Sequence, residues 1–205
     1  SHIDDHLAWI CGCESSLLFN NNAAALFLSI NTLAPGSEVI CSRGQIVEIG
    51  GSFRISDIIK KSDAILKEVG TTNRTHIEDY EKEISDRTKL LLWVHTSNYV
   101  VKGYTKEVAL EEIAKLGKKY NIPVLADLGS GTFLPLSKYG IPTEIPIKDI
   151  IKKGPDIVLF SGDKMLGGPQ SGIILASKNI IELIKSNTLY RTMRCDKITI
   201  ALLDQ

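Results

Sequence analysis

Short apolar runs alternate with amphipathic segments along most of the 205 residues. Seven runs have the length, the aliphatic content and the flanking turn residues of strands, at 16–20, 38–42, 64–69, 89–95, 123–128, 156–161 and 172–177. Helical patterns are predicted between and after them, at 22–33, 106–120, 147–152 and 179–185. This alternation predicts an α/β fold with a mostly parallel sheet and helices on both faces.

The overall composition is that of a globular protein with no strong electrostatic field. Lys and Arg number 24, equal to the 24 Asp and Glu. The chain therefore has no excess charge to attract nucleic acid, and an RNA partner would need a local patch or another part of the protein. No apolar stretch of about 18 residues predicts a membrane span, and no signal peptide is present.

The cysteines give a prediction about the compartment. Cys11 and Cys13 are one residue apart, whereas Cys41 and Cys195 are isolated, so no zinc-type spacing or ordinary disulfide is indicated. Free thiols are typical of a reducing cytosol. We therefore expect a cytoplasmic protein.

The strand predicted at 156–161 leads into the most informative segment, Ser161-Gly162-Asp163-Lys164-Met165. A lysine just beyond the carboxyl end of a strand lies where α/β folds bind their ligands. A partly desolvated amine at such a place loses its proton more easily and can form a Schiff base. The ordinary alternative is a solvated surface lysine, because lysine is rarely buried.

Two further strand ends carry polar residues. Asp127 ends a predicted strand, and its carboxylate is suited to pair with a protonated ring nitrogen; the alternatives are a metal ligand or a turn-forming aspartate. Asn21, Asn22 and Ala23 open the helix predicted at 22–33, where backbone N–H groups can bind phosphate. An ordinary capped helix is the alternative there.

Two more residues complete a predicted cofactor site. Ser161 is expected to give its hydroxyl to the same phosphate, and Asn98 to donate to a phenolic oxygen. A phosphate cradle, a ring-nitrogen partner, an oxygen donor and a lysine together fit pyridoxal 5'-phosphate (PLP) better than a nucleotide. No Gly-x-Gly-x-x-Gly or Walker-type motif is present. No cluster with metal-ligand spacing stands near Asp127, so no metal is predicted.

The same residues lie in segments that resemble bacterial selenocysteine synthases, the L-seryl-tRNA(Sec) selenium transferase family. The Ser-Gly-Asp-Lys and Glu-Ile-Gly-Gly-Ser-Phe-Arg sequences are the specific ones, whereas the run of asparagines is not. The resemblance extends over essentially the whole chain and is carried by residues 20–25, 42–54, 69–75, 95–99 and 161–172.

The resemblance implies a fold and a set of roles. Family members have the large domain of fold-type-I PLP enzymes, with a seven-stranded mixed sheet. Lys164 would carry the cofactor, Asp127 would face its ring nitrogen, and Asp163 is a further candidate for proton transfer. Arg191 and Arg194 match arginines that bind the phosphate of selenophosphate, which paired guanidinium groups suit; a solvated basic face is their alternative.

One role stays open in the sequence. Many enzymes of this fold stack an aromatic ring or a histidine on the cofactor after the second strand. This chain has Arg43, Gln45 and Glu48 there instead.

The implied reaction is the conversion of seryl-tRNA(Sec) to selenocysteinyl-tRNA(Sec) with selenophosphate, through loss of water and addition of selenium. Residues 1–205 would form the PLP-binding core, with the N-terminal tRNA-binding region and most of the small C-terminal domain lying outside them. Family members assemble as homo-oligomers, rings of dimers with shared sites. Two alternatives stay open: a related PLP-dependent lyase acting on a small amino acid or amino-sugar acid, and a catalytically inactive oligomerisation core.

Overall fold

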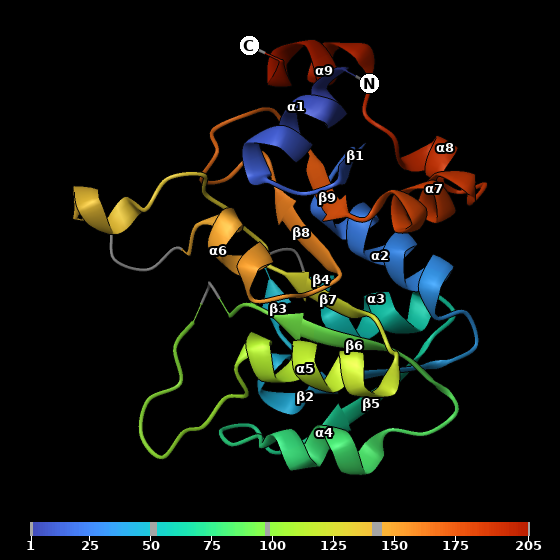
Figure 1. The fold of residues 1–205 in the computed structure, drawn as a ribbon, viewed down its shortest axis with the longest axis vertical. Coiled ribbons are helices and arrows are strands. Elements are labelled where there is room, and N and C mark those ends of the chain that lie inside the picture. The colour runs from blue at the N-terminus through green and yellow to red at the C-terminus, as the bar shows by residue number, and fades with distance from the viewer. Residues whose placement is uncertain (1, 50–52, 97–98, 141–144, 205) are drawn as a thin grey trace.

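The computed structural model describes residues 2–49, 53–96, 99–140 and 145–204. Seven of the described strands form one sheet in the order β1-β9-β8-β7-β6-β2-β5 (Figure 1). Their bounds are β1 Ser15–Phe19, β2 Glu38–Ser42, β5 Ile65–Val69, β6 Thr88–Val94, β7 Val124–Asp127, β8 Ile157–Ser161 and β9 Gly172–Ala176. Each differs from its predicted range by no more than one residue at either end, so the seven predicted strands are confirmed.

The sheet is mixed because one strand runs against the others. β2 pairs in parallel with β5 and β6, and β6, β7 and β8 continue in parallel. β9 is antiparallel to both β8 and β1, which makes β1 parallel to β8. The predicted mostly parallel sheet is therefore confirmed, with β9 as the antiparallel member.

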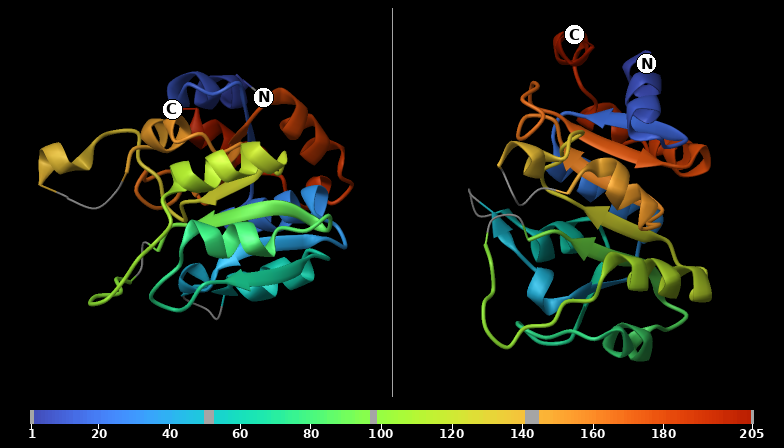
Figure 2. Two further views of the ribbon diagram at one scale, coloured as in Figure 1. Left: turned by 60° about the horizontal axis from the view of Figure 1, so that its bottom comes forward. Right: turned by 60° about the vertical axis from the view of Figure 1, so that its left-hand side comes forward.

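Helices cover both faces of this sheet, as predicted (Figure 2). The bounds are α1 His2–Cys11, α2 Asn22–Leu33, α3 Ile55–Lys61, α4 Ile77–Glu83, α5 Leu110–Tyr120, α6 Ile147–Lys152, α7 Lys178–Ser186, α8 Tyr190–Met193 and α9 Lys197–Leu203. A two-stranded hairpin of β3 Glu48–Ile49 and β4 Phe53–Arg54 and two short 3-10 turns, η1 Arg43–Gln45 and η2 Leu136–Tyr139, complete the described elements.

One helix begins later than predicted. The pattern suggested a start at Lys106, whereas α5 begins at Leu110. Lys106 instead bonds in an extended conformation with residues after β5: its N–H donates to Asn73 O at 2.9 Å, and its carbonyl accepts from Thr75 N at 2.9 Å. A residue in an extended bridge cannot also be helical, and this contact between distant segments leaves no periodic trace in the sequence.

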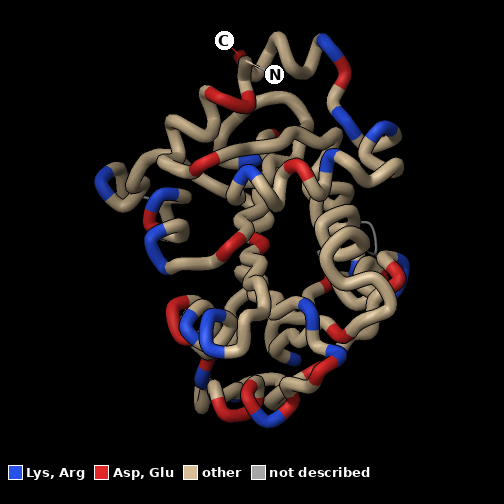
Figure 3. The backbone as a smooth tube through the Cα atoms, turned by 45° about the vertical axis from the view of Figure 1, so that its right-hand side comes forward, with Lys and Arg blue, Asp and Glu red and all other residues tan. Residues whose placement is uncertain are grey.

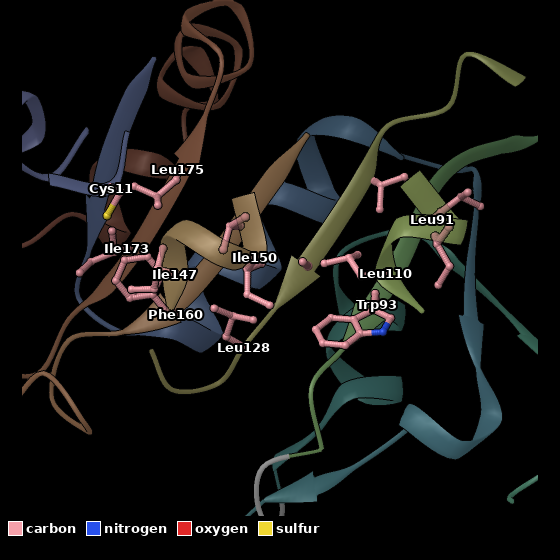
Figure 4. Packing of buried hydrophobic residues seen from close by; sticks show 14 of the residues in the cluster. Cys11, Leu91, Trp93, Leu110, Leu128, Ile147, Ile150, Phe160, Ile173 and Leu175 are labelled. Atoms are coloured by element: carbon pink, nitrogen blue, oxygen red, sulfur yellow. The ribbon is translucent and has the colours of Figure 1, made fainter. Parts of the chain in front are cut away.

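Two apolar cores separate the layers. Buried side chains of α1, α4, α5 and α6 pack on one face of the sheet, and those of α2, α3 and α7 pack on the other. Figure 4 shows part of the first core, where Phe160, Leu128, Ile147 and Ile150 gather beside the carboxyl ends of β7 and β8. Close packing on both faces fixes the positions of the strand ends.

Charged residues of both signs are spread over the outside of the fold, while long stretches of the central chain carry none (Figure 3). Within the described residues, no helix has the length and apolar character needed to cross a membrane. All four cysteines are free thiols, as predicted.

Candidate functional site at the carboxyl edge of the sheet

The sheet direction brings the predicted site segments to one edge. β1, β6, β7 and β8 all run the same way, so the residues that follow them emerge together. β9 begins at that edge, with Gly172 opposite both Phe19 and Ser161. The loop that carries Lys164 therefore leaves the edge from β8 and returns to it at β9.

Asp127 is the buried charged group of this edge, with 4% of its surface exposed. Its Oδ1 accepts hydrogen bonds from Asn22 Nδ2 at 2.9 Å and from Gly129 N at 3.0 Å. Burial raises the pKa of the Asp127 carboxyl, and the two hydrogen bonds and the positive charge of Lys164 partly oppose that rise. β7 and β8 are parallel neighbours, so the loop of Lys164 leaves the sheet at the same edge as Asp127.

Lys164 itself is exposed, as is the neighbouring Asp163, whereas Ser161 is buried. The loop is closed at its base because Gly162 N donates to Ser171 O at 2.9 Å and Gly168 N donates to Gly162 O at 2.9 Å. The amine therefore projects from a loop with fixed ends. This exposure agrees with the solvated alternative, and the cofactor role of Lys164 stays a prediction.

At the start of α2, the side chains of Asn21 and Asn22 make different contacts. The side chain of Asn21 caps the helix by accepting from Ala24 N at 2.8 Å. The side chain of Asn22 reaches Asp127 instead of standing free for an anion. Helix N-termini favour phosphate through their backbone amides, so the phosphate role of α2 and Ala23 stays a prediction.

Two buried polar atoms at this edge have no hydrogen-bond partner among the described residues. They are Oδ1 of Asn22 and Oγ of Ser130, which follows Asp127 by three residues. Unpaired buried polar atoms are rare in folded proteins, and they mark places where a ligand or a water molecule binds. The donor and acceptor set at this edge therefore fits a polar ligand beside Asp127.

Arg191 and Arg194 occupy a separate place. Both are exposed and line a cavity of about 610 Å³ together with Tyr190, Lys185 and Lys197. Lys164 and Asp127 are not among the residues that line it. The cavity lies against Leu18 of the edge strand β1, and the segment is attached to the end of that strand, with Asn20 N donating to Met193 O at 2.8 Å.

The comparisons with known proteins agree along the whole chain. The model of the family "SelA: L-seryl-tRNA selenium transferase" matches residues 1–205. The chain belongs to this family. It is 53% identical over 204 residues to the L-seryl-tRNA(Sec) selenium transferase of Clostridium botulinum (strain Okra / Type B1). It is 52% identical to the proteins of the same name from Caldanaerobacter subterraneus subsp. tengcongensis and Nitratidesulfovibrio vulgaris.

The alignments cover all of this chain but only part of each relative. Each alignment takes in 100% of this chain but 44% of the relative, so the chain spans less than half the length of the selenium transferases that it matches. Among solved structures, D-glucosaminate-6-phosphate ammonia-lyase superposes with a TM-score of 0.83 over 98% of this chain and 55% of that chain, at 20% identity. That likeness confirms the predicted fold-type-I architecture.

One predicted residue, Asn98, lies outside the described residues, so its role is untested. Among the residues that stand where a stacking group is usual, Arg43 pairs with Glu68 at 3.0 Å, and Glu48 pairs with Arg54 at 2.6 Å. Both residues thus have other partners.

Gln45, the third residue of that segment, is buried and accepts a hydrogen bond from Val94 N at 3.2 Å, at the end of β6. The ring of His95, the next residue, stacks on Trp93 with centroids 5.9 Å apart. The stacking role stays open.

Sequence reasoning missed the link between Asn22 and Asp127, which are 105 residues apart. It also missed the surface group of His2, His6 and Asp204, whose possible metal-ligand atoms all lie within 4.8 Å of one another. The i, i+4 spacing of the two histidines was the available signal for that group. None of the three belongs to the predicted cofactor site.

Proposed function

We propose that this chain is the PLP-binding catalytic core of an enzyme that converts seryl-tRNA(Sec) to selenocysteinyl-tRNA(Sec) with selenophosphate. The observation that carries the proposal is that the buried Asp127, the start of α2 and the loop of Lys164 come together at the carboxyl edge of the sheet. The names of relatives at 52–53% identity support the same reaction.

The residues present fit PLP. A buried carboxylate matches its protonated ring nitrogen, the start of α2 and Ser161 match its phosphate, and an accessible lysine matches its aldehyde. When bound, PLP withdraws electrons from the α-carbon of an attached amino acid. The unpaired Oδ1 of Asn22 and Oγ of Ser130 support further polar contacts at this edge.

Asp127 and Lys164 divide the proton chemistry. The Asp127 carboxylate holds the proton on the ring nitrogen, and its burial strengthens that ion pair because the surrounding dielectric is low. The Lys164 amine, exposed on its loop, takes the proton from the α-carbon of the seryl group as a general base. Asp163, next to it and exposed, is placed to exchange protons with solvent.

Arg191 and Arg194 supply the anion site for the selenium donor. Their exposed guanidinium groups, with Lys185 and Lys197, line one cavity and offer bidentate contacts to a phosphate group. Overall, the seryl hydroxyl leaves as water, selenium bonds to the β-carbon, and hydrolysis of the selenium–phosphorus bond releases phosphate. The arginines hold the donor for that second half.

The partners of the whole enzyme are part of the proposal. The equal numbers of acidic and basic residues favour tRNA binding mainly by regions beyond this core. We assign those regions to the N-terminal tRNA-binding part and the small C-terminal domain of the family, and we expect a cytoplasmic homo-oligomer of dimers with shared sites.

The lyase alternative has weaker support. The ammonia-lyase shares 20% identity, which shows the fold alone, whereas the transferases share more than half of the residues.

Borohydride trapping tests the proposal. Purified protein is incubated with PLP, reduced with borohydride, digested, and analysed by mass spectrometry for the pyridoxyl group. We expect the label on Lys164 and its loss in Lys164→Ala, while the exposed control Lys102→Ala keeps it. A label on another lysine, or one that persists in Lys164→Ala, would contradict the assignment.

A further inference from the structure

We propose that Asn22 is a positioning residue that holds one oxygen of the Asp127 carboxylate and leaves the other for the ring nitrogen of PLP. This inference rests on the proposed function and gives the Asn22 side chain a role that the sequence did not suggest, because the prediction there concerned backbone N–H groups and phosphate. The side chain instead contacts the carboxylate that serves the ring nitrogen of the cofactor.

The two hydrogen bonds to Asp127 converge on the same atom. Asn22 Nδ2 and Gly129 N both donate to Oδ1, at 2.9 and 3.0 Å. No described residue donates to Oδ2. Two donors on one oxygen fix the rotation of the carboxyl group, because turning it would break both bonds. The second oxygen is thereby kept in one place for a cationic N–H donor.

Asn22 is itself held in place by the backbone around it. It is the first residue of α2, directly after the cap that Asn21 makes to Ala24 N. Gly172 at the start of β9 lies so close that a Cβ there would be 2.7 Å from Asn22 N. The helix start is therefore seated on β9, and the Asn22 side chain projects from a rigid position.

The chemistry of the amide argues against a phosphate contact. A carboxylate accepts hydrogen bonds only, so the NH2 end of Asn22 must face Asp127 when that group is ionised. The end that remains is Oδ1, which is buried and has no partner among the described residues. An acceptor oxygen repels phosphate oxygens, so the free end of this side chain is suited to a donor.

Titration with PLP and with pyridoxal, which lacks the phosphate, separates the two roles. Binding of each compound is followed by its visible absorbance in wild type and in Asn22→Ala. Loss of a hydrogen bond to a charged group weakens binding by roughly tenfold to a hundredfold. We expect similar fold-losses for both compounds, because Asp127 serves the ring that they share. A loss confined to PLP would make Asn22 a phosphate ligand and overturn the inference.

Asn20→Ala is the matched control, since Asn20 is exposed and its side chain contacts Asn21 rather than Asp127. Its affinity for both compounds should equal that of wild type. A second readout is a double-mutant cycle with Asp127→Asn: adding Asn22→Ala to that variant should change pyridoxal affinity less than twofold if the two side chains act as a pair. Independent, multiplicative losses would contradict the pairing.

A second variant at position 22 serves if the alanine variant is unstable. If Asn22→Ala does not fold, as judged by circular dichroism, Asn22→Asp keeps the shape and places a like charge against Asp127. Asn22→Asp should bind both PLP and pyridoxal more weakly than wild type, and by a larger factor than Asn22→Ala. An affinity equal to that of wild type would overturn the inference. If wild type itself binds neither compound and takes no borohydride label, the proposed function fails, which is distinct from a wild type that binds both while Asn22→Ala does so equally well.

Discussion

The surroundings of Asp127 and of the two arginines differ in almost every physical respect. Asp127 is buried at the end of a central strand and bonded to two donors. Arg191 and Arg194 are exposed at the edge of the sheet, and neither makes an ion pair within the part of the chain that the structure describes. The Asp127 carboxylate is buried and held by hydrogen bonds, whereas the two guanidinium groups are exposed to solvent.

The difference matches the roles that we propose for the two regions. A charge that tunes a cofactor gains strength from burial and must not move, because its energy depends on distance in a low dielectric. Arginines that capture a soluble anion must be reachable, and they keep their charge in any surroundings. Stability and function should therefore respond in opposite ways when the two regions are altered.

The largest loss of stability should come from a change at Gly172, which packs against the backbone of Asn22 in the Asp127 region. In Gly172→Ala the new Cβ would lie 2.7 Å from Asn22 N and against the Asn21 carbonyl, so the start of α2 must shift. We expect a loss of about 3 kcal/mol in the free energy of unfolding, measured with urea. Gly36→Ala is the control: nothing lies within 4 Å of its Cβ, and its φ of +62° alone should cost about 1 kcal/mol. Equal losses would mean that the contact is relieved without strain.

On the exposed side, Arg194→Ala should change binding but not stability. Removal of one charge-assisted contact costs about 2 kcal/mol, roughly a thirtyfold weaker affinity for thiophosphate by calorimetry. The free energy of unfolding should stay within about 0.5 kcal/mol of wild type. Arg87→Ala is the control, because Arg87 is exposed just before the start of β6. This variant should alter neither the affinity nor the stability. A large loss of stability in Arg194→Ala would contradict the prediction, because it would show that this exposed arginine supports the fold as well as anion binding.

The buried carboxylate should make stability depend on pH. Because burial raises the pKa of Asp127, the folded protein binds this proton more tightly than the unfolded chain does. Its contribution to stability is therefore present at low pH and is lost as pH rises above about 4, the ordinary range of an aspartate. Relative to wild type, Asp127→Asn should gain about 1.4 kcal/mol for each unit by which that pKa is raised.

Urea titrations from pH 4 to 8 check this prediction. A difference between Asp127→Asn and wild type that stays constant over this range would show that burial does not govern the carboxyl group. Arg191→Ala, on the exposed side, gives the comparison, because its stability should run parallel to that of wild type over the whole range.

The smallest effects concern one helix cap in each region. Asn21 caps α2 on the Asp127 side, and Ser177 caps α7, which leads to the arginines. Asn21→Ala and Ser177→Ala should each lose about 1 kcal/mol of stability. PLP affinity should fall only in Asn21→Ala, because that cap holds Asn22. A fall in both variants would show a general effect of weakened folding.

Much of the fold follows from local patterns. The seven strands, α2, α6 and α7 are visible because hydrophobic runs and caps act over a few residues. The extended bridge that delays α5 and the reversed direction of β9 depend on pairing between distant segments. Asp127 and Lys164 could be predicted as candidates because strand ends carry ligands, whereas the hydrogen bond of Asn22 is visible only in three dimensions.

The reversal of β9 has one more consequence. The loop from Gly162 to Ser171 starts and finishes on neighbouring positions of the same sheet edge, and its ends are bonded to each other. It acts as a tether of set length for the amine at its tip. Lengthening or shortening it would change how far that amine reaches while leaving every strand in register.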